Sequence, residues 1–227
     1  MTEIRILPVT GLPEIAAGDD LGGLLYAHLP IPLEPVDVVV VTQKVVSNAE
    51  GRVIAASARY DAAEKESVRV LRRVGDMIIT ETRHGFVCAN SGVDASNVAE
   101  GTVALLPLDP DLSARRLRAQ LKHLSGVDVG VIVSDTFGRA WRKGQTDVAV
   151  GLAGIEAFID HRGATDDFGR ELNATQIAIA DELAGAAEMA MGKTQRVCAA
   201  IVRGAPVVAA YGSAADLVRP HAEDLFR

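Results

Sequence analysis

Two runs of β-branched residues constrain what this chain can fold into more than any other feature. The first reads Asp-Val-Val-Val-Val-Thr over Asp37–Thr42, and the second, over residues 127–134, ends in Val-Ile-Val-Ser. Neither run alternates apolar with polar residues, a pattern typical of strands that are buried on both faces. The sequence therefore predicts a sheet that other elements cover on both sides.

Two segments carry the signals of long helices. Ser113–Leu124 has leucines at helical spacing and begins with a serine that can cap a helix. Ala174–Met191 is rich in alanine and is followed by Gly192, a residue type that commonly ends helices. Weaker patterns predict shorter helices over residues 19–28 and 61–74.

Further strands are expected where short apolar runs are bounded by glycine or proline. These runs cover residues 4–9, 77–80, 85–89, 101–106, 197–202 and 206–210, and the second and third are joined through Arg83-His84-Gly85 as a hairpin. Strands and helices do not alternate strictly along the chain. We therefore predict an α+β fold, with mixed sheets and flanking helices, in a single domain over residues 1–227.

The overall composition limits the classes of function. The 227 residues carry a net charge of −7, which argues against a protein that coats nucleic acid, because such proteins need a basic surface. The two cysteines are far apart and form no C-x-x-C pair, so a zinc site is not favoured. The N-terminus has no signal-peptide pattern and the apolar runs are only strand-length. We therefore expect a cytoplasmic protein with no nucleic-acid or membrane partner.

The segment 134–147 is the richest in groups that can carry chemistry. Asp135 and Thr136 directly follow a predicted buried strand, and ligands often bind beyond the carboxyl ends of strands. Their oxygens are hard ligands that suit Mg²⁺ or Mn²⁺. Arg139 and Arg142 can bind phosphate oxygens. A polar turn with surface arginines and a core tryptophan explains the same residues equally well.

Asp94 is the centre of a second candidate segment, residues 89–98. Small and polar residues surround it, Gly92 permits close approach of the backbone, and Asn97 can face the same ligand as Asp94. For this segment alone, a turn between strands in which a side chain caps the backbone is the favoured interpretation.

Two further segments place polar groups or backbone amides where a strand ends. Residues 11–15 can present amides to a base or a phosphate, although a plain loop is the favoured interpretation there. Residues 42–52 carry Lys44 and Asn48 among several other polar side chains, and the alternative is a solvated helix start.

Gly192-Lys193-Thr194 resembles the end of a phosphate-binding P-loop, but the required first glycine is Ala187 and the motif follows a helix. We therefore reject a P-loop. Lys193 remains a candidate phosphate ligand.

Several of these segments occur together and in an order that resembles the coenzyme F420-0:L-glutamate ligase (gamma-glutamyl ligase) family. The matching motifs lie at residues 8–13, 47–52, 89–98, 135–145 and 168–172. The ending Arg219–Phe226 resembles the ligase half of longer, two-domain actinobacterial members. The sequence shows no counterpart of their flavin-binding half, so we expect the stand-alone form. The resemblance implies that family's unusual α+β fold and a homodimer.

The resemblance also implies a reaction. GTP phosphorylates the terminal carboxylate of coenzyme F420-0, and the amine of L-glutamate then attacks the acyl phosphate to form an amide, with further γ-linked glutamates as possible later additions. A divalent ion, Mg²⁺ or Mn²⁺, neutralises the phosphoryl charge, and K⁺ is a further candidate ion. GTP, F420-0 and L-glutamate are thus the expected partners.

The family motifs assign roles to particular residues. By motif position, Asp94, Asp135 and Thr136 hold metal, and Leu12, Pro13, Glu14, Ile15 and Asn97 contact the nucleotide. The chemistry of the residues adds Arg139 and Arg142 as catalytic candidates, and Gln43, Lys44, Asn48 and Lys193 as further candidates in the nucleotide site.

Three of these positions depart from the usual family pattern. Asn48 stands where the family usually has lysine, Gln43 where a small hydroxyl residue is frequent, and Lys193 where some members have an acidic residue. Lys44, four residues before Asn48, is the candidate replacement for the missing charge. The departures keep two alternatives open: a related ligase for another F420 precursor or amino acid, and a non-catalytic F420-binding protein.

Overall fold

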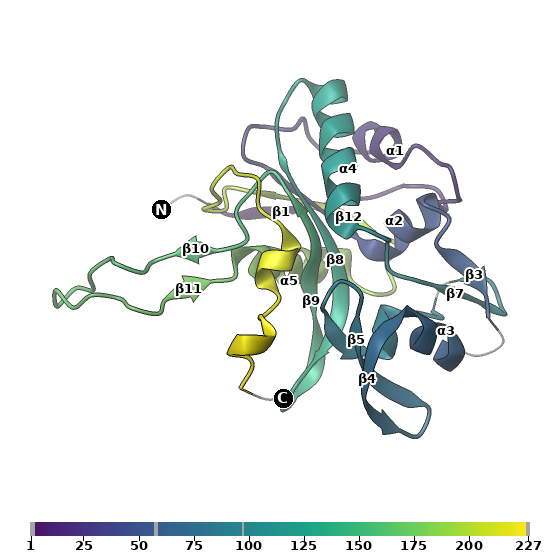
Figure 1. Cartoon of the computed structure of the whole chain (residues 1–227). Coiled ribbons are helices and arrows are strands. Elements are labelled where there is room, and N and C mark those ends of the chain that lie inside the picture. The colour runs from purple at the N-terminus through teal and green to yellow at the C-terminus, as the bar shows by residue number, and fades with distance from the viewer. Residues whose placement is uncertain (1–2, 57–58, 97, 226–227) are drawn as a thin grey trace.

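The computed structural model describes residues 3–56, 59–96 and 98–225, and a five-stranded sheet forms its centre (Figure 1). The strand order is β1 (Arg5–Val9), β12 (Ala199–Arg203), β2 (Val38–Thr42), β8 (Gly130–Arg139) and β9 (Arg142–Ala153). Strands β2 and β8 are parallel, and the other three neighbouring pairs are antiparallel. The predicted strands over 4–9, 37–42, 127–134 and 197–202 are thus confirmed, with β8 beginning later and running further than expected.

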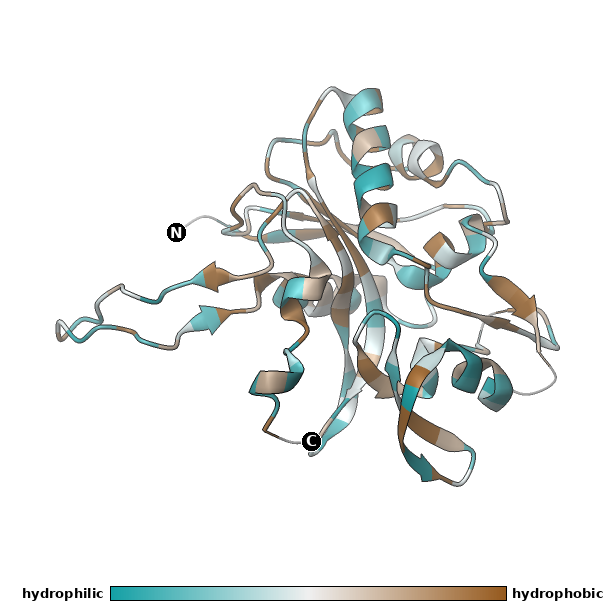
Figure 2. Cartoon of the chain, viewed as in Figure 1, coloured by the Kyte–Doolittle hydropathy of each residue, from teal (hydrophilic) through white to brown (hydrophobic). Residues whose placement is uncertain are grey.

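Both faces of this sheet are covered, as the unalternating valine runs predicted. On one face, Val39 and Val131 pack with residues of α1 (Leu21–Ala27) and α4 (Pro110–Ser125). On the other, Val38 and Ile132 pack with α5 (Ile179–Met191). Figure 2 shows the resulting apolar centre, with hydrophilic residues on the outer side of α4. The predicted α+β class is confirmed.

The starts of the two long helices differ from their predicted positions. Helix α4 begins at Pro110, because the Asp109 side chain accepts a hydrogen bond from the Leu112 amide and proline suits the first turn. The predicted cap, Ser113, lies inside the helix. Helix α5 begins at Ile179 and not at residue 174, because Gln176–Ile177 pairs as strand β11 with β10 (Ile159–Asp160). Helix α1 is confirmed, with Asp20 as its cap.

A smaller group of elements packs beside the main sheet. It contains α2 (Gln43–Ala49), β3 (Val53–Ala55), α3 (Arg59–Glu66), β4 (Ser67–Val74), β5 (Met77–Thr82), β6 (Val87–Ala89), η1 (Asn90–Gly92) and β7 (Thr102–Ala104). The predicted hairpin of β5 and β6 is confirmed. The predicted helix over 61–74 is wrong beyond Glu66. Its evenly spaced apolar residues Val68, Leu71 and Val74 are exposed on β4, whereas Val70 packs on the core of this lobe.

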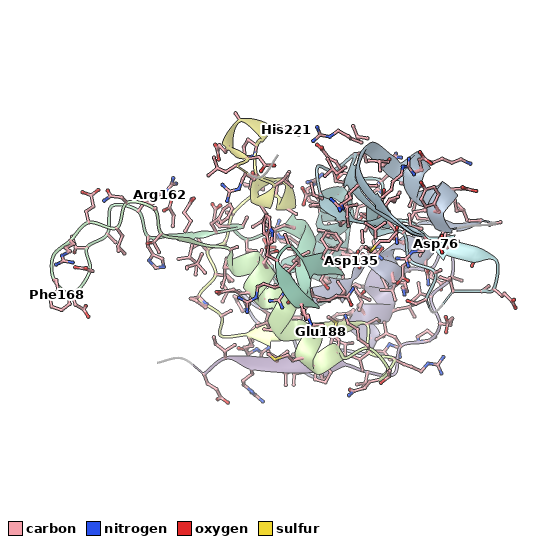
Figure 3. The ribbon with its side chains drawn as sticks, turned by 90° about the horizontal axis from the view of Figure 1, so that it is seen from below. Asp76, Asp135, Arg162, Phe168, Glu188 and His221 are labelled. Carbon is pink, nitrogen blue, oxygen red and sulfur yellow. The ribbon has the colours of Figure 1, made fainter. Side chains whose placement is uncertain are left out.

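Two features of the second half of the chain escaped the sequence patterns, and one strand predicted there is wrong. Strand β9 pairs with β8 in a long hairpin from Val131↔Ala153 to Arg139↔Arg142. Strands β10 and β11 are the base of an arm that projects from the body and ends near Phe168, which is 88% exposed (Figure 3). The strand predicted over 206–210 is wrong, since only Ala209 forms a single bridge there, to Ile155.

Short 3-10 turns complete the fold at η2 (Ala214–Leu217) and η3 (His221–Glu223). Within the described ranges, no helix combines the length and the apolar character that a membrane span needs. The predicted homodimer stays a prediction.

Gly151 tests how tightly α4 packs on the sheet. A Cβ atom at this buried position would overlap the carbonyl oxygen of Pro110, at the start of α4. We expect Gly151→Ala to lower the free energy of unfolding by about 1–3 kcal/mol, measured by urea denaturation, because backbone must shift to admit the methyl group. Gly138→Ala, in the same hairpin but with open space around its Cβ, is the matched control and should stay within about 0.5 kcal/mol of wild type. Equal losses in both variants would contradict this description of the packing.

Candidate functional site

A cavity of about 980 Å³ lies at the end of the sheet where β2 and β8 lead out of the core. Thr42 and Ser134 are partners in the parallel register of these strands, so the residues that follow each of them reach the same edge. Helix α2 begins at once with Gln43, and β8 continues into Asp135 and Thr136. Residues 12–15, and parts of the segments 89–96 and 188–198, also contribute to the wall.

Asp94 and Asp135 form the first oxygen cluster of this cavity, together with Lys44 and Ser96. Lys44 Nζ lies 2.6 Å from Asp94 Oδ2 and donates to the Ser96 carbonyl oxygen at 2.7 Å. Asp94 also accepts hydrogen bonds from the amide and the hydroxyl of Ser96, at 2.7 and 2.8 Å. Burial opposes this charge, but the hydrogen bonds from Lys44 and Ser96 prevail and lower the pKa of Asp94.

Asp135 has less support for its charge than Asp94. It accepts a hydrogen bond from the Thr136 amide at 2.9 Å, and among the described residues no lysine, arginine or histidine forms an ion pair with it. Burial raises the pKa of Asp135 to about 7, and the nearby charges of Asp147 and Asp94 act in the same direction. A cation placed beside Asp135 would therefore stabilise its ionised form.

Asp147 is the centre of a second cluster, on the other side of β8. Its carboxylate is 3% exposed and accepts hydrogen bonds from Ser134 Oγ at 2.9 Å and Thr136 Oγ1 at 2.6 Å. Lys193 Nζ lies 3.0 Å from Asp147 Oδ1, 2.6 Å from Thr136 Oγ1 and 3.4 Å from Glu188 Oε1. Burial tends to lower the pKa of Lys193. The hydrogen bond that Lys193 donates to Asp147 and the negative charge of Asp147 outweigh burial and raise this pKa.

The two clusters follow from the geometry of a strand. Successive side chains of β8 point to opposite sides, so Ser134 and Thr136 share one side and Asp135 has the other. The predicted set of metal ligands is therefore split: the Thr136 hydroxyl lies with Asp147 and Lys193. Asp147 was missed by the sequence reading, although its place opposite Thr136 in the β8–β9 register shows how it enters the cavity.

The predicted nucleotide contacts largely line the same cavity. Those present in its wall are Leu12, Pro13, Glu14, Ile15, Gln43, Lys44, Asn48 and Lys193. Asn48 Oδ1 is buried and has no hydrogen-bond partner among the described residues. It also borders an adjoining cavity of about 330 Å³, which shares Glu14 and Ile15 with the first. Asn97 lies outside the described residues.

Arg139 and Arg142 are not in the cavity wall, since they lie at the exposed tip of the β8–β9 hairpin. Arg139 donates to the Lys143 carbonyl oxygen at 2.9 Å. Trp141, at the same tip, is 82% exposed, so it is not the core tryptophan that the alternative interpretation as a polar turn expected. The structure instead brings Arg59 into the wall, where its Nε donates to the Val93 carbonyl oxygen at 2.7 Å. Sequence reading missed Arg59 because it lies on a short, charged helix.

The first cluster has the chemistry of a site for a hard divalent ion. Asp94 and Asp135 offer carboxylate oxygens, and Asp135 is buried without an ion-pair partner among the described residues. Over the ranges that the structure describes, no group of three or more His, Cys, Asp or Glu side chains is arranged to hold a metal ion. Two carboxylates fit Mg²⁺, which commonly takes one or two from the protein and completes its shell with water and substrate phosphates.

Comparison with known proteins gives a consistent result along the whole chain. A family model described as F420-0:Gamma-glutamyl ligase matches residues 10–69 and 55–204. The chain is 39% identical to the coenzyme F420:L-glutamate ligase of Methanothermobacter thermautotrophicus, in an alignment that covers 99% of each protein. It is 41% identical to the enzyme of the same name from Methanocaldococcus jannaschii, covering 99% of this chain and 98% of that protein.

The raised pKa of Asp135 predicts a stability that depends on pH. An acid whose pKa is higher in the folded state makes unfolding easier as pH rises, here between the ordinary value of 3.8 and about 7. In metal-free buffer, we expect Asp135→Asn to raise the free energy of unfolding by about 2–4 kcal/mol at pH 8, and by little near pH 4.

Urea denaturation in EDTA at several pH values measures this difference. Asp76→Asn, in the exposed turn between β4 and β5, is the control and should show no such trend. A gain from Asp135→Asn that does not grow with pH would rule out a buried charge at this position.

Proposed function

The chain belongs to the F420-0:gamma-glutamyl ligase family, and on that premise we propose that it joins L-glutamate to coenzyme F420-0 with GTP as phosphoryl donor. The observation that carries this proposal is the pair Asp94 and Asp135, with Lys44 beside them, in a cavity of about 980 Å³. That volume is at the upper end for small-molecule sites. It suits a ligase, which must hold a nucleotide and an acceptor acid together.

The proposed reaction has two steps. First, a carboxylate oxygen of F420-0 attacks the γ-phosphorus of GTP, so that a new P–O bond forms as the bond to GDP breaks. Second, the glutamate amine attacks the acyl carbon, phosphate leaves with its bonding electrons, and the amine loses a proton as the amide forms. Most of the catalysis in such chemistry comes from positioning and from stabilising charge.

The lining residues divide this work. Asp94 and Asp135 would hold Mg²⁺ or Mn²⁺, which when bound neutralises charge on the phosphoryl group. Lys44 and Lys193 present ammonium groups to the cavity from two sides, and Arg59 adds a guanidinium. Cations in these positions can orient phosphate oxygens and stabilise the negative charge that shifts during transfer.

The remaining assignments are part of the same proposal. Residues 12–15 and Asn48 are the proposed nucleotide contacts, and of these Glu14, Ile15 and Asn48 border both adjoining cavities. Arg139 and Arg142 can act only if the hairpin tip bends toward the cavity. A homodimer is supported by the projecting arm with Phe168 exposed at its tip. K⁺ as a further ion and a cytoplasmic location stay predictions.

Mass spectrometry of the reaction mixture tests this function. With F420-0, GTP, L-glutamate and Mn²⁺, we expect the wild-type protein to add one glutamyl mass to F420-0 and to release GDP. Asp135→Asn should lower the rate by at least about 100-fold while the protein stays folded, because a preorganised charge contact is lost. Asp76→Asn is the control and should leave the rate unchanged.

The same experiment separates the alternatives. GDP release with another acceptor acid or amino acid, but not with F420-0 and L-glutamate, would favour a related ligase. Tight F420 binding by fluorescence titration without GTP turnover would favour a non-catalytic binding protein. Either result would overturn the proposed function.

A further inference from the structure

Lys193 contacts the second oxygen cluster in the way that a bound cation would. Its Nζ atom lies within 3.4 Å of oxygens from Thr136, Asp147 and Glu188, which belong to β8, β9 and α5. Three separate elements therefore direct oxygen atoms at one point. Lys193 directly follows Gly192, the residue that caps the C-terminus of α5, and its side chain extends to this point.

The surroundings of Asp147 require a positive charge at that point. Asp147 is nearly inaccessible to solvent, and both of its oxygens already accept hydroxyl hydrogen bonds from Ser134 and Thr136. An ionised carboxylate in such a place is strongly destabilising unless a cation pairs with it. Lys193 supplies this cation, and its exposed flank faces the cavity.

The first cluster differs in this respect. Lys44 pairs directly with Asp94, while no ion pair reaches Asp135 among the described residues. Among the described residues, Asp147 thus has a lysine as its ion-pair partner and Asp135 has none. An additional cation would therefore stabilise the side of β8 that holds Asp135 more than the side that faces Asp147.

We propose that Lys193 takes the place of a second metal ion, so that each chain binds a single divalent ion, at Asp94 and Asp135. The proposal rests on the proposed function for the ion at the first cluster, but its claim about Lys193 stands on the second. A second divalent ion would have to displace an ammonium that the chain itself holds in position. The fixed ammonium can instead present its positive charge to a phosphate oxygen.

Counting bound Mn²⁺ tests this inference without measuring activity. Mn²⁺ alone is titrated into nucleotide-free protein, and the free ion is followed by electron paramagnetic resonance. We expect one ion per wild-type chain and two per chain of Lys193→Gln. Lys193→Arg keeps the charge and should bind one. Lys122 lies on α4 and pairs with Asp128. Lys122→Gln is the matched control and should also bind one ion.

The melting temperature supplies a second readout. Lys193→Gln leaves Asp147 buried without its cation, so we expect a lower melting temperature in EDTA and a recovery of several degrees on adding Mn²⁺. The double variant Lys193→Gln/Asp147→Asn removes both charges. It should melt close to wild type and bind one ion, which keeps the test valid if the single variant folds poorly.

The outcomes separate this inference from the proposed function. Two ions on the wild type, one unchanged ion on Lys193→Gln, or two ions on the double variant would overturn the role of Lys193 alone. No ion on the wild type with one on Lys193→Gln would support that role and contradict a metal at Asp94 and Asp135. No ion on either protein would overturn both.

Discussion

The rest of this structure depends on how negative charge is kept inside one cavity. Asp94, Asp135 and Asp147 approach one another closely enough that the other two raise the pKa of Asp135. Among the described residues, Lys44 and Ser96 stabilise the charge of Asp94, two hydroxyls and Lys193 stabilise that of Asp147, and one backbone amide donates to Asp135. Because a lone buried charge is unfavourable, the least supported carboxylate is the one with most to gain from an added cation. Burial of Asp135 therefore costs stability in the metal-free protein, and this is the carboxylate at which we propose that a cation binds.

The fold creates this arrangement through one parallel strand pair. β2 and β8 end side by side, so α2 brings Lys44 and Asn48 to the same edge at which β8 delivers Asp135. Antiparallel β9 then returns Asp147 to the opposite side of β8. The valines that precede these residues are fully buried, and a rigid, packed sheet fixes polar groups more accurately than a loop can. The tight contact of Gly151 with α4 is part of the same rigidity.

Sequence alone predicted those parts of the molecule that rest on local signals. The buried runs over 37–42 and 127–134 located the central strands, and the residues beyond them located half of the cavity. Strand β9 was missed because its glycines and polar residues have no clear alternation, and its pairing with β8 stabilises it where propensity does not. Asp147 was missed for the same reason, since its role exists only in the β8–β9 register. Thr136 was grouped with Asp135 by adjacency in sequence, whereas adjacency in a strand places them apart.

Asn48 shows what the loss of one charge means in this setting. It lies one helical turn beyond Lys44 on α2, so both side chains point to the same side of the helix. Lys44 contacts Asp94, and Lys193 contacts Asp147. Among the residues that the structure describes, none donates a hydrogen bond to the buried Asn48 Oδ1 in the wall. A third ammonium at position 48 would add positive charge where Lys44 already stands. A neutral amide with an unmet acceptor instead favours a ligand that donates a hydrogen bond, as the edge of a guanine base can. We therefore expect Asn48 to contribute to recognition of a ligand, and Lys44 and Lys193 to supply positive charge to the cavity.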